Sequence, residues 1–125
     1  MNPSDIHSAL DFRFVLADGV LKKTAKLDGQ VVAARRPKQT QIVQVEPIEE
    51  GIVVREDYFR FEGSNVYLVD YDFRELWVAQ LPSDSDSFAN PVSRVPGGLS
   101  CGSWEGWRCL LSTKTGKIIS KEFTK

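Results

Sequence analysis

The sequence predicts an all-β protein, an antiparallel meander of about eight strands that closes as a small barrel or packs as a two-sheet sandwich. β-branched and aromatic residues fill short runs such as 52–61 and 66–69, which is typical of strands. Turn residues separate these runs, and pairs such as Asp18-Gly19 are a strong hairpin signal. No segment offers the crossover helix that parallel strands require, so at most a short N-terminal helix is expected.

Four strands are expected in the first part of the chain, each ended by a turn residue. Residues 12–16 place large apolar side chains at every second position, the period that marks a strand. Asp28-Gly29 is a second hairpin signal, and Pro37 ends the third strand because proline cannot donate to a ladder. The four runs cover residues 12–16, 20–27, 30–36 and 39–48.

The central run, residues 52–61, changes its alternation of facing side chains at residues 55–57. A β-bulge or a strand break at that point reconciles the two halves. Runs 66–69 and 76–81 then complete a hairpin around an acidic turn.

Residues 82–106 are rich in Pro, Ser, Gly, Asp and Asn and show no periodicity, which predicts a long loop. A final hairpin follows over residues 107–112 and 117–123. We therefore expect a single antiparallel β domain over residues 12–125, preceded by a flexible or short helical N-terminus over residues 1–11.

Three segments share the order of strand, polar turn and strand: residues 16–27, 69–81 and 112–123. The last two are similar to parts of propeller blades, in which such hairpins recur at intervals of roughly 40–45 residues. No family is assigned on this likeness, because any β-meander repeats the same pattern.

The chain has a formal net charge of −1, but the charge is unevenly distributed. Residues 13–40 and 91–125 carry +5 and +4, whereas residues 41–90 carry −8. On the simpler interpretation neighbouring hairpins neutralise one another; on the other, a two-faced surface steers a charged partner. No apolar run spans a bilayer and no secretory signal is evident, so a cytoplasmic protein without membrane contact is expected.

Enzymatic chemistry has little support in the residue types present. One histidine, His7, and two cysteines do not make a zinc cluster, and acidic pairs such as Asp84 and Asp86 do not match a calcium loop. Nucleophilic catalysis needs a positioned imidazole. Cys101 and Cys109 are expected to be reduced thiols, and Cys109 a small buried residue. We expect no catalytic residue, no metal and no cofactor.

The leading hypothesis is a non-enzymatic binding module that engages another protein, or a second copy of itself, through the long loop and its Trp-Glu-Gly-Trp-Arg segment. Tryptophan and arginine are enriched at binding hot spots, and arginine stacks on indole faces. The alternative for each tryptophan alone is burial in the core. The candidate partner-binding residues are Trp104, Glu105, Trp107, Arg108 and Arg94.

Two further hypotheses remain open. A barrel of about eight strands holds one small apolar ligand in its cavity. Alternatively, a basic patch tracks the phosphates of single-stranded nucleic acid, with Tyr58, Phe59 or Phe61 as stacking platforms, although the acidic isoelectric point argues against this. The basic patch comprises Lys22, Lys23, Lys26, Arg35, Arg36 and Lys38.

Overall fold

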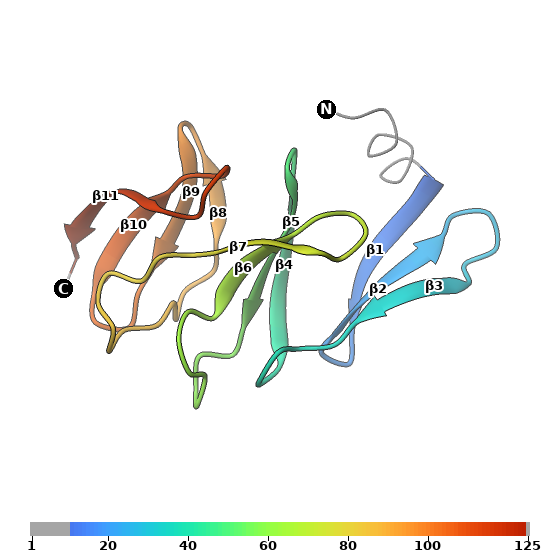
Figure 1. The fold of residues 1–125 in the computed structure, drawn as a ribbon, viewed down its shortest axis with the longest axis horizontal. Coiled ribbons are helices and arrows are strands. Elements are labelled where there is room, and N and C mark those ends of the chain that lie inside the picture. The colour runs from blue at the N-terminus through green and yellow to red at the C-terminus, as the bar shows by residue number, and fades with distance from the viewer. Residues whose placement is uncertain (1–10, 125) are drawn as a thin grey trace.

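The computed structural model describes residues 11–124 and contains eleven strands in three antiparallel sheets (Figure 1). The first sheet consists of β1 (Phe12–Ala17), β2 (Val20–Ala25) and β3 (Val31–Arg35). The middle sheet consists of β4 (Ile42–Ile48), β5 (Gly51–Glu56), β6 (Val66–Val69) and β7 (Glu75–Val78). The last sheet consists of β8 (Ser93–Val95), β9 (Gly98–Gly102), β10 (Trp107–Leu111) and β11 (Ile118–Phe123). Within each sheet every strand pairs with the next along the chain, so all three sheets are meanders.

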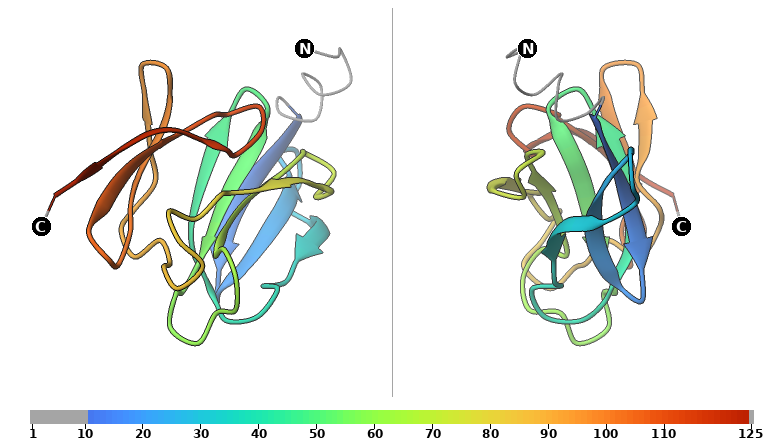
Figure 2. Two further views of the ribbon diagram at one scale, coloured as in Figure 1. Left: turned by 60° about the vertical axis from the view of Figure 1, so that its left-hand side comes forward. Right: turned by 90° about the vertical axis from the view of Figure 1, so that its right-hand side faces the viewer.

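The middle sheet lies between the other two and is buried on both faces (Figures 1 and 2). Ile52 and Tyr67 pack in the core shared with the first sheet. Their neighbours Val53 and Leu68 pack in the core shared with the last sheet. Because both faces are covered, β5 and β6 are apolar at almost every position, in contrast to a sheet with one face in water.

The expected all-β, antiparallel architecture is confirmed, and so is the first hairpin signal. Asp18 and Gly19 both have positive φ angles, 53° and 74°, as a two-residue type I′ turn requires. The second signal gives a longer turn, in which the amide of Gly29 donates to the carbonyl of Ala25. The change in side-chain alternation at residues 55–57 is explained by a strand break, because β5 ends at Glu56.

Three expectations differ from the structure. The described residues form three open sheets in place of a closed barrel or a two-sheet sandwich, and eleven strands in place of about eight. Two of the extra strands, β8 and β9, lie within residues 82–106, where a loop was expected. Their buried positions, Leu99 and Cys101, alternate with serine and glycine, which hide the period of a strand. The expectation for the N-terminus lies almost wholly outside the described residues.

The middle and last sheets are built on one plan. Gly51 and Gly98 each begin the second strand of their sheet, with φ angles of 154° and 157°. A Cβ at either glycine would overlap the carbonyl oxygen of the residue that ends the third strand, Val69 or Leu111. The similar segments 69–81 and 112–123 each contain the turn after the third strand and the whole fourth strand of their sheet. Stacked four-stranded meanders of this kind are the arrangement of propeller blades.

Candidate functional site

Three loops meet at one end of the stack, the lower end in Figure 1: residues 57–65, 79–92 and 103–106. Phe88 forms an isolated bridge with Ser103, and the amide of Trp104 donates to the carbonyl of Ser87 at 2.8 Å. These contacts hold the loop of the last sheet against the connection that leads into that sheet.

Asn65 fixes the same connection to the middle sheet. Its side chain is fully buried and donates to the carbonyls of Glu56 and Phe88, both at 2.8 Å. Its amide oxygen accepts from the amide of Phe88 at 2.9 Å. The three loops therefore have a defined arrangement, which a binding surface made of loops requires.

Aromatic rings from two of these loops lie together at the surface. Tyr58 and Trp104 stack with ring centroids 5.5 Å apart and planes inclined by 25°. Trp104 remains 57% exposed, and the neighbouring Phe59 is 65% exposed. We call Tyr58, Phe59 and Trp104 the aromatic edge. A hollow of about 370 Å³ adjoins it, lined by Tyr58, Ala89, Asn90, Ser103 and Trp104.

The loops around the aromatic edge are acidic. Residues 57–65, 82–90 and 103–106 contain five carboxylates and one guanidinium, a net charge of −4. None of these five carboxylates forms an ion pair within residues 11–124, where the ion pairs present use other acidic residues. The five are Asp57, Glu62, Asp84, Asp86 and Glu105.

Neutral donors satisfy two of these carboxylates. Glu105 accepts from the hydroxyls of Ser83 and Ser85 at 3.2–3.3 Å. Asp86 is buried, and its Oδ1 accepts from the amides of Ser87 and Glu105. Its Oδ2 has no hydrogen-bond partner among the described residues. Neutral hydroxyl and amide donors of the chain thus hold the carboxylates of Asp86 and Glu105 in place.

The other residues expected to bind a partner lie elsewhere. Trp107 is half-buried against the core between the middle and last sheets, where its ring meets Phe123 edge-on at 5.3 Å. Arg94, on β8, pairs with Glu46 at 3.5 Å. Of the expected set, Trp104 belongs to the aromatic edge and Glu105 follows it in the chain.

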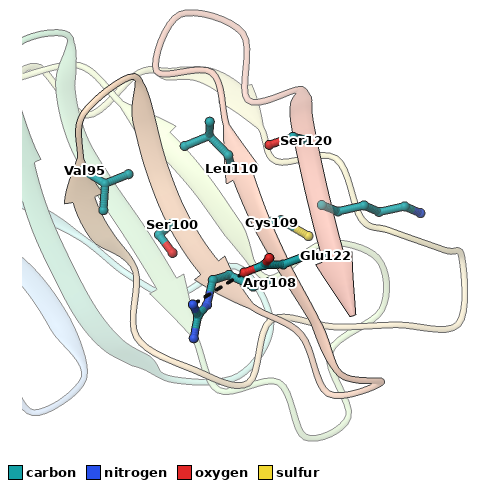
Figure 3. A pocket seen from close by; sticks show the side chains of 8 residues that line it. Val95, Ser100, Arg108, Cys109, Leu110, Ser120 and Glu122 are labelled. Carbon is teal, nitrogen blue, oxygen red and sulfur yellow. Dashed lines mark ion pairs between the residues drawn. The ribbon is translucent and has the colours of Figure 1, made fainter. Parts of the chain in front are cut away.

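Arg108 lies on the outer face of the last sheet, turned away from the middle sheet, and pairs with Glu122 at 3.6 Å (Figure 3). This face is hollowed by about 540 Å³. The strand registers allow this face to be compared with the middle sheet position by position. The positions on the outer face of the last sheet correspond to those through which the middle sheet packs against the last sheet. Ile48, Val53, Val66, Leu68, Trp77 and Ala79 of the middle sheet correspond to Val95, Ser100, Arg108, Leu110, Ser120 and Glu122.

Four of the six corresponding residues on the outer face are therefore polar where the middle sheet is apolar or small. Ser120 stands where the middle sheet has Trp77, and Ser100 stands where it has Val53. These small side chains do not fill the space above the sheet, which leaves the hollow in Figure 3. This face suits contact with water better than apolar packing.

Half of the expected basic patch is turned toward the middle sheet. Lys23 donates to the carbonyl of Tyr71 and Arg35 to that of Phe73, while Lys38 pairs with Glu75 at 2.6 Å. The remaining members are partly or fully exposed and lie on other positions of the first sheet and its connections: Lys22, Lys26 and Arg36. The six side chains do not share one face.

A buried carboxylate joins the first and middle sheets. Glu56 accepts from the amides of Lys38, Gln39 and Thr40 and from the hydroxyl of Tyr67. Burial alone would raise the pKa of Glu56, but these four hydrogen bonds outweigh burial and lower it. Burial and the neighbouring carboxylate together raise the pKa of Tyr67. Each oxygen of the Glu56 carboxylate accepts two hydrogen bonds. The carboxylate therefore holds residues 38–40, which lead into β4, in place, and neither oxygen is available for a reaction.

The cysteines are free and face each other across β9 and β10 in register. Both are buried, and burial raises the pKa of Cys101 to about 12 and that of Cys109 in the same direction. Thiols of this kind are unreactive. Within residues 11–124 no three His, Cys, Asp or Glu side chains gather as a metal site requires. The same range contains no helix long and apolar enough to cross a membrane.

The pairing of Tyr58 with Trp104 was not predicted from the sequence, because Tyr58 and Phe59 were considered only as part of a nucleic-acid surface. The one available signal was composition: exposed aromatic residues in two loops rich in acidic and small residues. The pairing itself depends on the stacking of the sheets, because Tyr58 lies in a loop of the middle sheet and Trp104 in a loop of the last sheet.

The fold and the site together define a stack of three antiparallel sheets with an acidic, aromatic loop end. No protein-family model matches the chain, and no curated protein matches it. Among solved structures, it is similar to the computationally designed Ika8 protein, with a TM-score of 0.65 and 14% identity. The match covers 91% of this chain and 33% of that protein, so the chain spans about a third of the length of its structural relative. At this identity the likeness concerns the fold alone.

Proposed function

We propose that the protein is a non-enzymatic binding module that engages another protein through the aromatic edge. The single observation that carries the proposal is the stacked Tyr58–Trp104 pair, in which the large indole is 57% exposed; Phe59, next to Tyr58 in the chain, is exposed as well. Exposed aromatic side chains held in a fixed arrangement supply contact area at a small cost in conformational entropy.

The two alternatives have less support. A ligand inside a barrel needs a closed interior, whereas the described sheets are open. Binding of single-stranded nucleic acid needs a continuous basic track, whereas Lys23, Arg35 and Lys38 are engaged with the middle sheet. A cytoplasmic location belongs to the proposal and is supported by the two free thiols.

Affinity capture from the native host tests the proposal. The double variant Phe59→Ala and Trp104→Ala removes the exposed aromatic surface, and we expect it to lose a partner that the wild-type protein retains. Phe123→Ala is the matched control, because Phe123 is also 58% exposed but lies on β11. Circular dichroism of each variant confirms an intact fold. Equal recovery of the same partner with the double variant would refute the assignment.

A further inference from the structure

We propose that the aromatic edge recognises a basic, extended peptide segment, in which arginine or lysine side chains lie on the exposed rings and beside the loop carboxylates. This inference rests on the proposed function and adds the chemistry of the partner. It follows from the charge around the rings, the intramolecular contacts of the same rings, and the shape of the hollow.

The negative charge around the aromatic edge favours a positively charged partner. The three loops at this end carry a net charge of −4, and none of their carboxylates has an ion pair among the described residues. Asp86 adds a buried carboxylate oxygen, Oδ2, that receives no hydrogen bond from residues 11–124. Such a field attracts a basic segment and repels phosphates, which argues for a peptide over a nucleic acid.

A cation of the chain itself already lies against one ring of the aromatic edge. The guanidinium of Arg60 lies 5.3 Å from the ring centroid of Phe59, a cation–π distance. Elsewhere in the fold Lys121 lies over Trp107 at 4.6 Å and Lys38 over Tyr67 at 4.6 Å. The Trp104 side chain, 57% exposed, offers the same type of contact to an arginine or lysine supplied by a partner, with Glu105 next to it in the chain.

The shape of the site favours an extended segment. The hollow beside the rings has about 370 Å³ and is formed by loops of the middle and last sheets, with the polar Asn90 and Ser103 on its wall. This space accepts one or two side chains, not a folded domain. Grooves lined by aromatic rings commonly bind extended, proline-containing peptides, whose preformed conformation reduces the loss of entropy.

Fluorescence anisotropy with three labelled decapeptides tests the inference: (Arg-Pro)₅, (Ser-Pro)₅ and (Glu-Pro)₅. We expect (Arg-Pro)₅ to bind at least about 10-fold more tightly than the other two at low salt, and to weaken as salt is added. Trp104→Ala should weaken its binding about 10-fold, and the double variant Glu62→Gln and Asp84→Asn about 3-fold to 10-fold. Phe123→Ala and Glu49→Gln are the matched controls and should leave it unchanged.

Several outcomes would overturn the inference: no binding of (Arg-Pro)₅, equal binding of (Glu-Pro)₅, or binding that Trp104→Ala does not weaken. Preferential binding of a single-stranded oligonucleotide in the same assay would assign the surface to nucleic acid instead. If capture of a cellular partner depends on Trp104 while (Arg-Pro)₅ does not bind, the proposed function stands and the basic chemistry of the partner is wrong.

Discussion

Replacing Glu56 by glutamine tests how the first and middle sheets are joined. The carboxylate accepts four hydrogen bonds, two on each oxygen. Glutamine keeps the shape but offers a single acceptor oxygen. If that oxygen serves the amides of Gln39 and Thr40, the new NH₂ group faces the amide of Lys38, which then has no acceptor.

The size of the effect follows from these contacts. Hydrogen bonds to a charged acceptor contribute about 1.5–3 kcal/mol each, and a buried donor left unsatisfied costs about 1–3 kcal/mol. With two bonds retained at reduced strength and the amide of Lys38 opposed by a donor, Glu56→Gln should reduce the free energy of unfolding by about 3 kcal/mol. Glu62→Gln is the control, because the exposed carboxylate of Glu62 makes no hydrogen bond within residues 11–124, and it should cost less than about 0.5 kcal/mol.

Urea denaturation at pH 7 measures both variants, and the midpoint for Glu56→Gln should fall by about 1–3 M. The pKa of Glu56 is lowered in the folded protein, so the stability it adds is present above the unfolded pKa of about 4.3 and is lost as pH falls through the folded pKa. The difference between wild type and variant should therefore shrink below about pH 4. A loss under about 1 kcal/mol at pH 7 would refute the assigned hydrogen bonds.

Three further predictions concern the stack itself. Gly51→Ala and Gly98→Ala should each reduce the free energy of unfolding by roughly 3 kcal/mol in urea, because a Cβ there meets a carbonyl oxygen and φ is unfavourable; a neutral result would contradict the shared plan of the two sheets. Trp77→Ala should cost about 3–5 kcal/mol, against less than about 1 kcal/mol for its neighbour Leu76→Ala, which is 51% exposed. Neither cysteine should react with Ellman's reagent in the native protein at pH 8, and both should react in denaturant.

The sequence predicted the hairpins because their signals are local. Asp18-Gly19 formed the expected turn, and the pairs of strands around it and around residues 70–74 followed from the alternation of side chains. The number of sheets depends on which faces are buried. Ile52, Val53 and Val54 are apolar at three successive positions, a pattern that indicates a strand covered on both faces. That signal was available and points to a stack of sheets instead of a barrel.

The missed strands β8 and β9 show where local patterns fail. β8 contains Ser93, Arg94 and Val95, all exposed, and β9 alternates two buried residues with glycine and serine. Their identity as strands comes from pairing: β9 pairs with β10, which holds Leu99 and Cys101 opposite Leu111 and Cys109, and β8 pairs with β9. A propensity argument cannot supply that partner, because pairing is a property of the sheet.

The candidate site could be predicted only in part, because its residues come together through the pairing and stacking of sheets and not through local sequence. Trp104 lies between Ser103 and Glu105 at the end of the expected loop and was identified from the sequence as a candidate. Arg94, Trp107 and Arg108 are close to it in the chain but occupy β8 and β10, whose geometry carries them elsewhere. Tyr58 lies in the loop between β5 and β6 of the middle sheet and reaches Trp104 through the stacking of the middle and last sheets.

The most direct test of the aromatic edge is a ¹H–¹⁵N spectrum of the three tryptophan indoles during titration with (Arg-Pro)₅. The account predicts that the Nε1–H signal of Trp104 shifts progressively. The signal of Trp77, whose Nε1–H is bonded to the carbonyl of Thr113 at 2.9 Å, should stay in place. Movement of the Trp77 or Trp107 signal with Trp104 unchanged would contradict the assignment of the binding surface.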